Sequence, residues 1–284
     1  MHGIDPNTID KFITEALYED VRDGDHTSLA CIPAESRSKA RLLVKDPGVI
    51  AGVELAEMIF KKVDPTAIVD VRIKDGSDVF YGDEAFYVEC NSQALLKAER
   101  LVLNTMQRMS GIATLSSRFA VEVEGTGVTI LDTRKTTPLL RFLEKWAVTT
   151  GGCQNYRDGL YDWIMIKDNH IDACGTITKA VQQVHKYFEE KGIKLGITVE
   201  VRNLVELYEV LEVGGITRIM LDNFELPILR EAVAIIGKKF ESEASGGVNL
   251  NTVRAIAETG VDFISVGALT HSAGQLDLSL KVMK

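Results

Sequence analysis

The sequence predicts an α/β protein whose C-terminal part is an α/β barrel. Six apolar runs of strand length occur after residue 113, and their nearly continuous apolar composition is typical of parallel strands covered on both faces. Helical segments lie between most of them, and the last runs begin about 22 residues apart, the length of one short βα unit. A doubly wound sheet is the second choice, because no glycine-rich nucleotide fingerprint follows the first run. The six runs are 128–131, 163–166, 197–201, 218–221, 240–244 and 263–266.

The first 112 residues predict a smaller α+β unit. An amphipathic helix with Asn7 as its cap and Ile9 and Ile13 on one face opens the chain. A long helix over residues 93–121, with a break or bend expected at Gly111, leads to the domain boundary, which we place between residues 112 and 113. Between these helices come β-like runs at 40–44, 49–51, 69–73 and 85–90 and a helix over 53–62.

Composition excludes several classes of protein. The net charge of −9 argues against a sequence-independent grip on nucleic acid, although it permits a local basic pocket. No apolar stretch is long enough to predict a membrane span, and the first residues lack the pattern of a signal peptide. The four cysteines form no CxxC pair and no zinc-ligand cluster, so we expect reduced thiols in a cytoplasmic protein.

Charged and glycine residues follow the ends of the predicted strands. In a barrel these carboxyl ends meet at one mouth, where active sites lie, whereas isolated polar residues can simply mark where strands end. Both signs of charge recur at this one end, which favours a site. The residues in question are Asp132, Arg134 and Lys135; Lys167, Asp168, Asn169 and His170; Glu200 and Arg202; Asp222 and Asn223; Ser245, Gly246 and Gly247; and Gly267.

Two glycine loops predict a phosphate site. Ser245-Gly246-Gly247 stands between a strand and a helix expected near Asn249, and Gly267 repeats the pattern one strand later. Glycine lets backbone N–H groups approach an anion, and a helix N-terminus adds partial positive charge. Two ordinary βα turns are the alternative. Cys153 could serve as a nucleophile, but a loop cysteine that fills space is the simpler interpretation.

Cations and carboxylates at the same mouth predict an anionic substrate and a metal. Arginine and lysine bind carboxylates and phosphates, and Glu200 and Asp222 could hold Mg²⁺ through their oxygens. The alternative is that these carboxylates neutralise the cations in internal ion pairs. The candidate cations are Arg134, Lys135, Arg157 and Lys167.

Several motifs together closely resemble quinolinate phosphoribosyltransferase over nearly the whole chain. They are Asp132-Thr-Arg-Lys-Thr-Thr-Pro138, Gly151-Gly-Cys-Gln-Asn-Tyr-Arg-Asp-Gly-Leu160, Ile166-Lys-Asp-Asn-His170, Val199-Glu-Val201, Leu221-Asp-Asn223 and Glu243-Ala-Ser-Gly-Gly247. The resemblance implies an N-terminal α/β sandwich, an incomplete C-terminal α/β barrel, and a final helix that packs back on the N-terminal domain. It implies transfer of phosphoribose from phosphoribosyl pyrophosphate to quinolinate with Mg²⁺, which gives nicotinate mononucleotide, pyrophosphate and CO2 for NAD synthesis.

The resemblance also implies residue roles. Lys135, Lys167, Glu200 and Asp222 would be catalytic, and the last two would hold the metal. A homodimer would share its active sites, with Arg100 reaching the neighbouring subunit's site, although a solvated helix face also explains Arg100. The substrate-binding set would be Arg100, Arg134, Lys135, Tyr156, Arg157, Lys167, Glu200, Asp222, Ser245, Gly246, Gly247 and Gly267.

The chain departs from the family pattern at two positions. Tyr156 stands where the family usually has histidine, so a hydroxyl replaces a group that can carry positive charge. Leu139 stands where the family often has glycine, which predicts a differently shaped loop. Two alternatives therefore remain open: a related transferase of the kind found beside molybdenum transport systems, acting on another base, and a catalytically silent relative.

Overall fold

The computed structural model describes residues 3–283, which form two compact units. Unit 1 contains the chain up to Ser117, the segment Phe142–Gly152 and the chain from Ala273 onward. Unit 2 contains Arg118–Arg141 and Cys153–Ser272. A single crossing near residue 112 was expected, but the chain returns to unit 1 twice. No helix in the described residues is long and apolar enough to cross a membrane.

Unit 1 is built on a four-stranded antiparallel sheet in the order β12-β1-β5-β3, with a separate β2–β4 pair. The expected final helix is wrong, because the last element is strand β12, which pairs antiparallel with β1 from Ala40↔Val282 to Val44↔Leu278. Alternating apolar residues at 278 and 280 suit a strand with one buried face. The strands are β1 (Arg37–Val44), β2 (Gly48–Val49), β3 (Ile68–Val71), β4 (Asp78–Val79), β5 (Glu84–Asn91) and β12 (Leu278–Val282).

The first helix of unit 1 is capped by Asp5, whose side chain accepts a hydrogen bond from Asn7 N. Asn7 was the expected cap, but it lies inside the helix. The long helix runs through Gly111 without a break. Glycine is required there because an added Cβ would lie 2.0 Å from the carbonyl oxygen of Gly274. The helices are α1 (Pro6–Val21), α2 (His26–Cys31), α3 (Val53–Val63), α4 (Ser92–Glu122) and α5 (Arg141–Thr150), of which α4 ends and α5 begins in unit 2.

Most of α5 belongs to unit 1 because of its long-range contacts. The guanidinium of Arg108 donates to the buried carboxylate of Glu144 at 2.8 Å, and Phe142 meets Phe12 edge-on with ring centroids 5.5 Å apart. Neither contact can be read from local sequence, since the partners lie 36 and 130 residues apart.

Unit 2 is a six-stranded parallel sheet in the order β6-β11-β10-β9-β8-β7. The first strand therefore lies beside the last, and consecutive strands from β7 to β11 are neighbours. This is an α/β barrel left open between β6 and β7, and it excludes the doubly wound order, in which the first strand is central. The strands are β6 (Thr129–Leu131), β7 (Ile164–Ile166), β8 (Ile197–Val201), β9 (Arg218–Asp222), β10 (Glu241–Ser245) and β11 (Phe263–Ser265).

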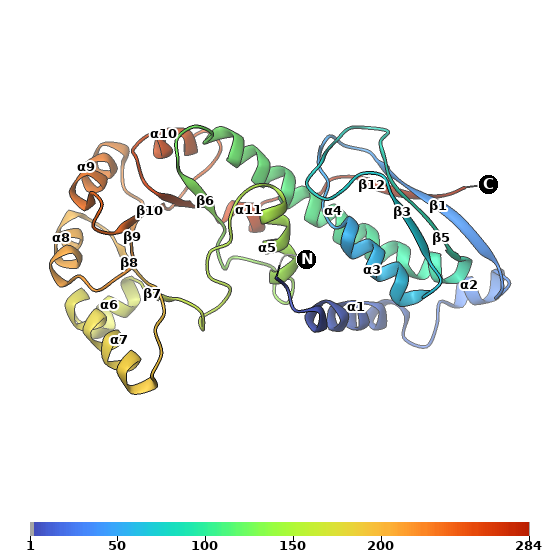
Figure 1. The fold of residues 1–284 in the computed structure, drawn as a ribbon, viewed down its shortest axis with the longest axis horizontal. Coiled ribbons are helices and arrows are strands. Elements are labelled where there is room, and N and C mark those ends of the chain that lie inside the picture. Colours follow the sequence, from blue (N-terminus) through green and yellow to red (C-terminus); the bar gives the residue numbers. More distant parts are fainter. Residues whose placement is uncertain (1–2, 284) are drawn as a thin grey trace. The chain divides into compact units, whose positions relative to one another are not determined.

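Helices cover the outside of this sheet. Figure 1 shows α7, α8 and α9 following one another around β7 to β10. Buried apolar residues on these helices, such as Leu207 and Leu229, pack over strands that are buried along their length. The helices of unit 2 are α6 (Asp168–Cys174), α7 (Ile177–Lys191), α8 (Leu204–Val213), α9 (Leu226–Ile236), α10 (Val253–Ala257) and α11 (Ala268–His271).

Candidate active site

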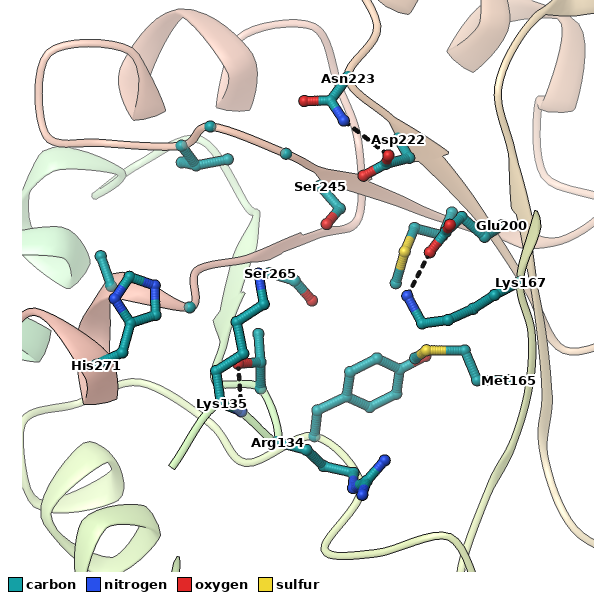
Figure 2. A pocket seen from close by; sticks show the side chains of 18 of the residues that line it. Arg134, Lys135, Met165, Lys167, Glu200, Asp222, Asn223, Ser245, Ser265 and His271 are labelled. Carbon is teal, nitrogen blue, oxygen red and sulfur yellow. Dashed lines mark hydrogen bonds and ion pairs between the residues drawn. The ribbon is translucent and has the colours of Figure 1, made fainter. Parts of the chain in front are cut away.

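A cavity of about 670 Å³ lies at the carboxyl ends of the parallel strands. Figure 2 shows labelled side chains from every strand end, including Arg134, Lys167 and Ser245, arranged around this one space. Of the residues to which catalytic, substrate-binding or metal-binding roles were assigned, all but Arg100 line the cavity. The other strand-end residues Asp132, Asp168, Asn169, His170 and Arg202 do not line it. The lining residues are Thr133, Arg134, Lys135, Tyr156, Arg157, Met165, Lys167, Glu200, Met220, Asp222, Asn223, Ser245, Gly246, Gly247, Val248, Ser265, Gly267, Ala268 and His271.

Two arginines place positive charge at one side of the cavity. The Nε of Arg134 is buried and has no hydrogen-bond partner among the described residues, so its donor is available to a bound anion. Arg157 donates from Nη1 to the backbone oxygen of Trp163 at 3.2 Å. Burial and then the charge of Arg134 lower the pKa of Arg157, the effect expected of two like charges in a partly dry site. An anion between them would relieve both effects.

Lys167 reaches the cavity from β7, and its Nζ donates to Glu200 Oε2 at 2.6 Å. Glu200 is 8% exposed and lies on the neighbouring strand β8. The pairing fixes the lysine head group and leaves Glu200 Oε1 without a hydrogen bond among the described residues. The internal ion pair of the alternative interpretation therefore exists here, but it occupies only one carboxylate oxygen.

Asp222 ends β9, and its Oδ2 accepts from Asn223 Nδ2 at 2.7 Å. Strands β8 and β9 pair with each other, and Glu200 on β8 lies opposite Met220, two residues before Asp222 on β9. The two carboxylates therefore stand at adjacent strand ends. No group of three or more metal-binding side chains occurs among the described residues. The two carboxylates suit an oxygen-seeking Mg²⁺ only if waters and substrate oxygens complete its shell, which is the usual arrangement for this ion.

The glycine loop after β10 differs from the expectation in one respect. The helix that follows it begins at Val253 and not near Asn249, and it is only five residues long. Its N-terminus therefore lies away from the loop, and any phosphate contact must come from the loop itself. Gly246 and Gly247 both have positive φ angles, of 97° and 61°, which favour glycine.

Gly246→Ala should lower kcat/KM by about tenfold or more, because a Cβ there would lie 2.9 Å from Asn223 N and force two strand-end loops apart. The matched control is Gly247→Ala, which has positive φ but nothing within 4 Å of the added carbon. Steady-state kinetics on both variants checks this. Equal losses in the two variants would contradict the close-approach argument.

The loops after β6 and β11 are tied together. Thr270 Oγ1 donates to the backbone oxygen of Lys135 at 2.8 Å. An added Cβ at Gly267 would lie 3.1 Å from both Lys135 Cδ and His271 Nε2, so these two side chains flank Gly267. The arrangement places a lysine, an imidazole and a glycine backbone on one wall of the cavity, a combination suited to phosphate oxygens.

Sequence reasoning missed several lining residues, among them His271, Ser265 and Met165. Asn223 was among the polar residues at the strand ends but was given no role. His271 lies four residues after Gly267, so the same reasoning from strand ends could have included it. Ser265 and Met165 lie within strands, where their residue types do not differ from those of core positions. Cys153 is 5% exposed and is not a lining residue, which favours the space-filling interpretation.

Tyr156 lines the cavity, but its hydroxyl is engaged inside the barrel. The hydroxyl lies 2.5 Å from the Oγ1 of fully buried Thr198, and the backbone N of Tyr156 donates to Asp132 Oδ1 at 2.8 Å. Burial, followed by the charge of Glu243, raises the pKa of Tyr156. The residue therefore presents a neutral aromatic ring at the position where the resembling family has histidine.

Leu139 keeps the backbone conformation of a glycine. Its φ is 66°, and Leu140 N donates to Thr137 O at 3.1 Å, so Pro138 and Leu139 occupy the central positions of a tight turn. Proline followed by a positive φ is the pattern of a type II turn. The side chain is 91% exposed, so no packing offsets the strain.

Leu139→Gly should therefore raise the free energy of unfolding by about 0.5–1 kcal/mol, since the left-handed strain of leucine exceeds the added backbone entropy of glycine. Chemical denaturation measures this. Leu160→Gly is the control, because Leu160 is also exposed but does not have a positive φ angle. This substitution should therefore only lower the free energy of unfolding. A stability loss in both variants would rule out strain at Leu139.

Arg100 is exposed on α4 in unit 1 and does not line the cavity. The helix-face alternative accounts for its position within a single chain.

Comparison with known proteins agrees with the motifs. The family model described as the C-terminal domain of quinolinate phosphoribosyl transferase matches residues 112–281, and that of the N-terminal domain matches residues 25–110. Quinolinate phosphoribosyltransferase [decarboxylating] 1b of Nicotiana tabacum is 48% identical over 282 residues, covering 94% of this chain and 80% of the tobacco protein. The probable nicotinate-nucleotide pyrophosphorylase [carboxylating] of Bacillus subtilis is 38% identical over 272 residues, covering 96% of this chain and 92% of the bacterial one.

A solved structure shows the same fold over the full length. The crystal structure of NadC from Streptococcus pyogenes superposes with a TM-score of 0.93 at 34% identity and covers 100% of both chains. The strand order, the strand-end cavity, both domain models and these relatives lead to one conclusion: this chain belongs to the quinolinate phosphoribosyltransferase family.

Proposed function

We propose that this chain transfers the phosphoribosyl group of phosphoribosyl pyrophosphate to quinolinate, with loss of CO2, to give nicotinate mononucleotide and pyrophosphate for NAD biosynthesis. The observation that carries the proposal is the cavity at the strand ends, where four cations and two carboxylates face glycine loops. The cations and the loops suit two anionic substrates, and the carboxylates suit a metal and ribose hydroxyls.

The arginine side of the cavity is assigned to quinolinate. This substrate carries two carboxylates, and binding it in a partly dry site requires fixed positive charge. Arg134 supplies that charge from the loop after β6, Arg157 from the segment between α5 and β7, and Lys167 from the end of β7. The unpartnered Nε of Arg134 supports the assignment, because a buried donor is costly unless a ligand completes its hydrogen bond.

The opposite wall is assigned to the phosphoribosyl donor. Lys135 and the backbones of Ser245, Gly246, Gly247 and Gly267 would hold the 5′-phosphate. Glu200 and Asp222 would hold the ribose hydroxyls and Mg²⁺, which when bound neutralises charge on the departing pyrophosphate. Lys167 and Glu200, linked at 2.6 Å, join the two halves of the site.

The reaction needs positioning and electrostatics more than proton transfer. Bond breaking to pyrophosphate leaves positive charge on the ribose carbon, and the nearby carboxylates Glu200 and Asp222 stabilise that charge. Quinolinate supplies its ring nitrogen as the nucleophile. Once bonded to ribose, the positively charged nitrogen stabilises the electron pair that is left on the adjacent ring carbon as CO2 departs. A proton from water then takes the place of the carboxylate at that carbon, so the protein need only orient the departing carboxylate.

The active enzyme is proposed to be a homodimer with shared sites. Arg100 is an exposed cation within a unit that does not contribute to the cavity of its own chain, which suits a residue that serves a neighbouring subunit. A cytoplasmic location is also proposed. Its support is that Cys31, Cys90, Cys153 and Cys174 are free thiols, as in reducing compartments.

The choice of base distinguishes this function from a transferase for another base. Purified protein should be given phosphoribosyl pyrophosphate, Mg²⁺ and either quinolinate or nicotinate, which has one carboxylate where quinolinate has two. We expect the nucleotide product from quinolinate and little from nicotinate, because Arg134 and Arg157 would lose one partner. Preference for nicotinate or for an unrelated base would overturn the assignment.

A further inference from the structure

A buried carboxylate lies inside the barrel and touches the back of two cavity walls. Glu243, on β10, is fully buried and is not itself a cavity-lining residue. Its Oε1 accepts a short hydrogen bond from Ser265 Oγ, and its Oε2 accepts from Arg218 Nη1 at 3.1 Å. It also interacts with the hydroxyl of Tyr156, whose ring centroid lies 5.1 Å from the guanidinium carbon of the same Arg218. Ser265 and Tyr156 both line the cavity, but Ser265 comes from β11 and Tyr156 from the segment between α5 and β7.

Two further groups hold the hydroxyl of Tyr156. It lies 2.5 Å from Thr198 Oγ1, which also accepts from Trp163 Nε1 at 2.9 Å. The hydroxyl interacts as well with the buried carboxylate of Glu243. These contacts restrict the position of the Tyr156 ring.

Arg218 opposes the effect of burial on Glu243 and holds its carboxylate in place. Burial raises the pKa of Glu243, whereas the hydrogen bond from Ser265 and the charge of Arg218 lower it. Its side chain is 8% exposed and lies between Glu243 and Glu241, with Nε 2.9 Å from Glu241 Oε2. Its guanidinium carbon lies 3.7 Å from the ring centroid of Phe263 and 5.1 Å from that of Tyr156. A buried, multiply bonded ion pair of this kind holds its partners in a single geometry.

We infer that Glu243 is a positioning residue that fixes both substrate walls of the cavity, Ser265 on the wall of the phosphoribosyl donor and Tyr156 on the wall of quinolinate. The inference rests on the proposed function for the identity of the substrates. Ser265 belongs to the donor wall because it stands two residues before Gly267, and Tyr156 belongs to the quinolinate wall because it immediately precedes Arg157. Glu243 contacts both although it reaches neither substrate.

Four variants separate positioning from a purely structural role. Ser265→Ala removes a hydrogen-bond donor to Glu243, and Tyr156→Phe removes the hydroxyl that interacts with Glu243 while keeping the ring. Glu243→Gln keeps the shape of the side chain but replaces one acceptor oxygen by an NH2 group, which cannot accept a hydrogen bond from Ser265 or Arg218. The matched control is Glu241→Gln, which alters the other carboxylate of Arg218 at a half-exposed position without touching Ser265 or Tyr156.

The expected readout is the KM of each substrate, with thermal unfolding as the check on folding. Ser265→Ala should raise the KM of phosphoribosyl pyrophosphate about fivefold, and Tyr156→Phe should raise the KM of quinolinate by a similar factor, each leaving the other KM unchanged. Glu243→Gln should raise both. Glu241→Gln should leave both within about twofold of the unaltered protein.

Unchanged KM values in Ser265→Ala and Tyr156→Phe would overturn the inference, even if Glu243→Gln fails to fold. Equal rises in both KM values for Glu243→Gln and Glu241→Gln would also overturn it, because the effect would then belong to Arg218. Calorimetric titration of each substrate makes the same comparison without turnover. A lack of product from the unaltered protein would therefore count against the proposed function and not against this inference.

Discussion

Arg134→Ala should lower kcat/KM for quinolinate about 100-fold, mainly through KM, because hydrogen bonds to a charged partner contribute roughly 1.5–3 kcal/mol each. Arg134 has the strongest structural reason for such an effect, since its Nε is buried without a partner among the described residues. Arg134→Lys should recover only part of the loss, because lysine cannot donate two parallel hydrogen bonds to a carboxylate. Initial-rate kinetics with each substrate varied in turn measures both effects.

Arg202→Ala provides the matched control for Arg134. Arg202 also follows a strand of the barrel, but it is exposed, pairs with Glu206 at 2.6 Å and does not line the cavity. Its removal should change kcat/KM by less than about twofold. If Arg134→Ala bound quinolinate as well as Arg202→Ala does, the assignment of the arginine wall would be wrong.

Arg100→Ala and Lys167→Ala should each be nearly inactive alone and active together. If Arg100 completes the site of a neighbouring subunit, a hybrid dimer holds one site with both residues intact and one site with neither. Random pairing of equal amounts puts half of the subunits into hybrids, so co-expression should restore roughly a quarter of the unaltered activity. Two different affinity tags allow the hybrid to be purified and assayed directly.

Two controls accompany the hybrid experiment. Lys97→Ala changes another cation on the same helix, which is absent from the cavity, and it should retain activity. Glu200→Ala with Lys167→Ala should fail to complement, because both residues belong to one chain's cavity. Recovery in that pair, or no recovery with Arg100→Ala, would argue against a shared site.

The sequence predicted the barrel strands well because their signal is local. Each strand of unit 2 lies within a few residues of its predicted run, for example β8 at Ile197–Val201. The charged strand-end residues that were assigned roles meet in one cavity as expected, whereas others, such as Arg202, do not line it. The alternation of apolar runs and helical segments depends on no distant contact. Active sites of α/β barrels lie at the carboxyl ends of the strands, so the same pattern also predicts where the site lies. For this reason Lys167, Glu200 and Asp222 could be chosen from the sequence.

The features that were missed depend on distant contacts. The final segment was expected to be helical, but pairing with β1 makes it strand β12. The phosphate cradle was expected at a helix N-terminus, but the helix begins at Val253. Glu243 appeared only as part of a motif, because its importance depends on Ser265 and Tyr156, which come from two other parts of unit 2.

The most direct test of the central claim is the joint measurement of nicotinate mononucleotide and CO2 from carboxyl-labelled quinolinate. With phosphoribosyl pyrophosphate and Mg²⁺ present, the account predicts equal amounts of both products, and neither product when the donor or the metal is left out. Formation of CO2 without the nucleotide, or the absence of both over a broad range of pH and substrate concentration, would contradict it.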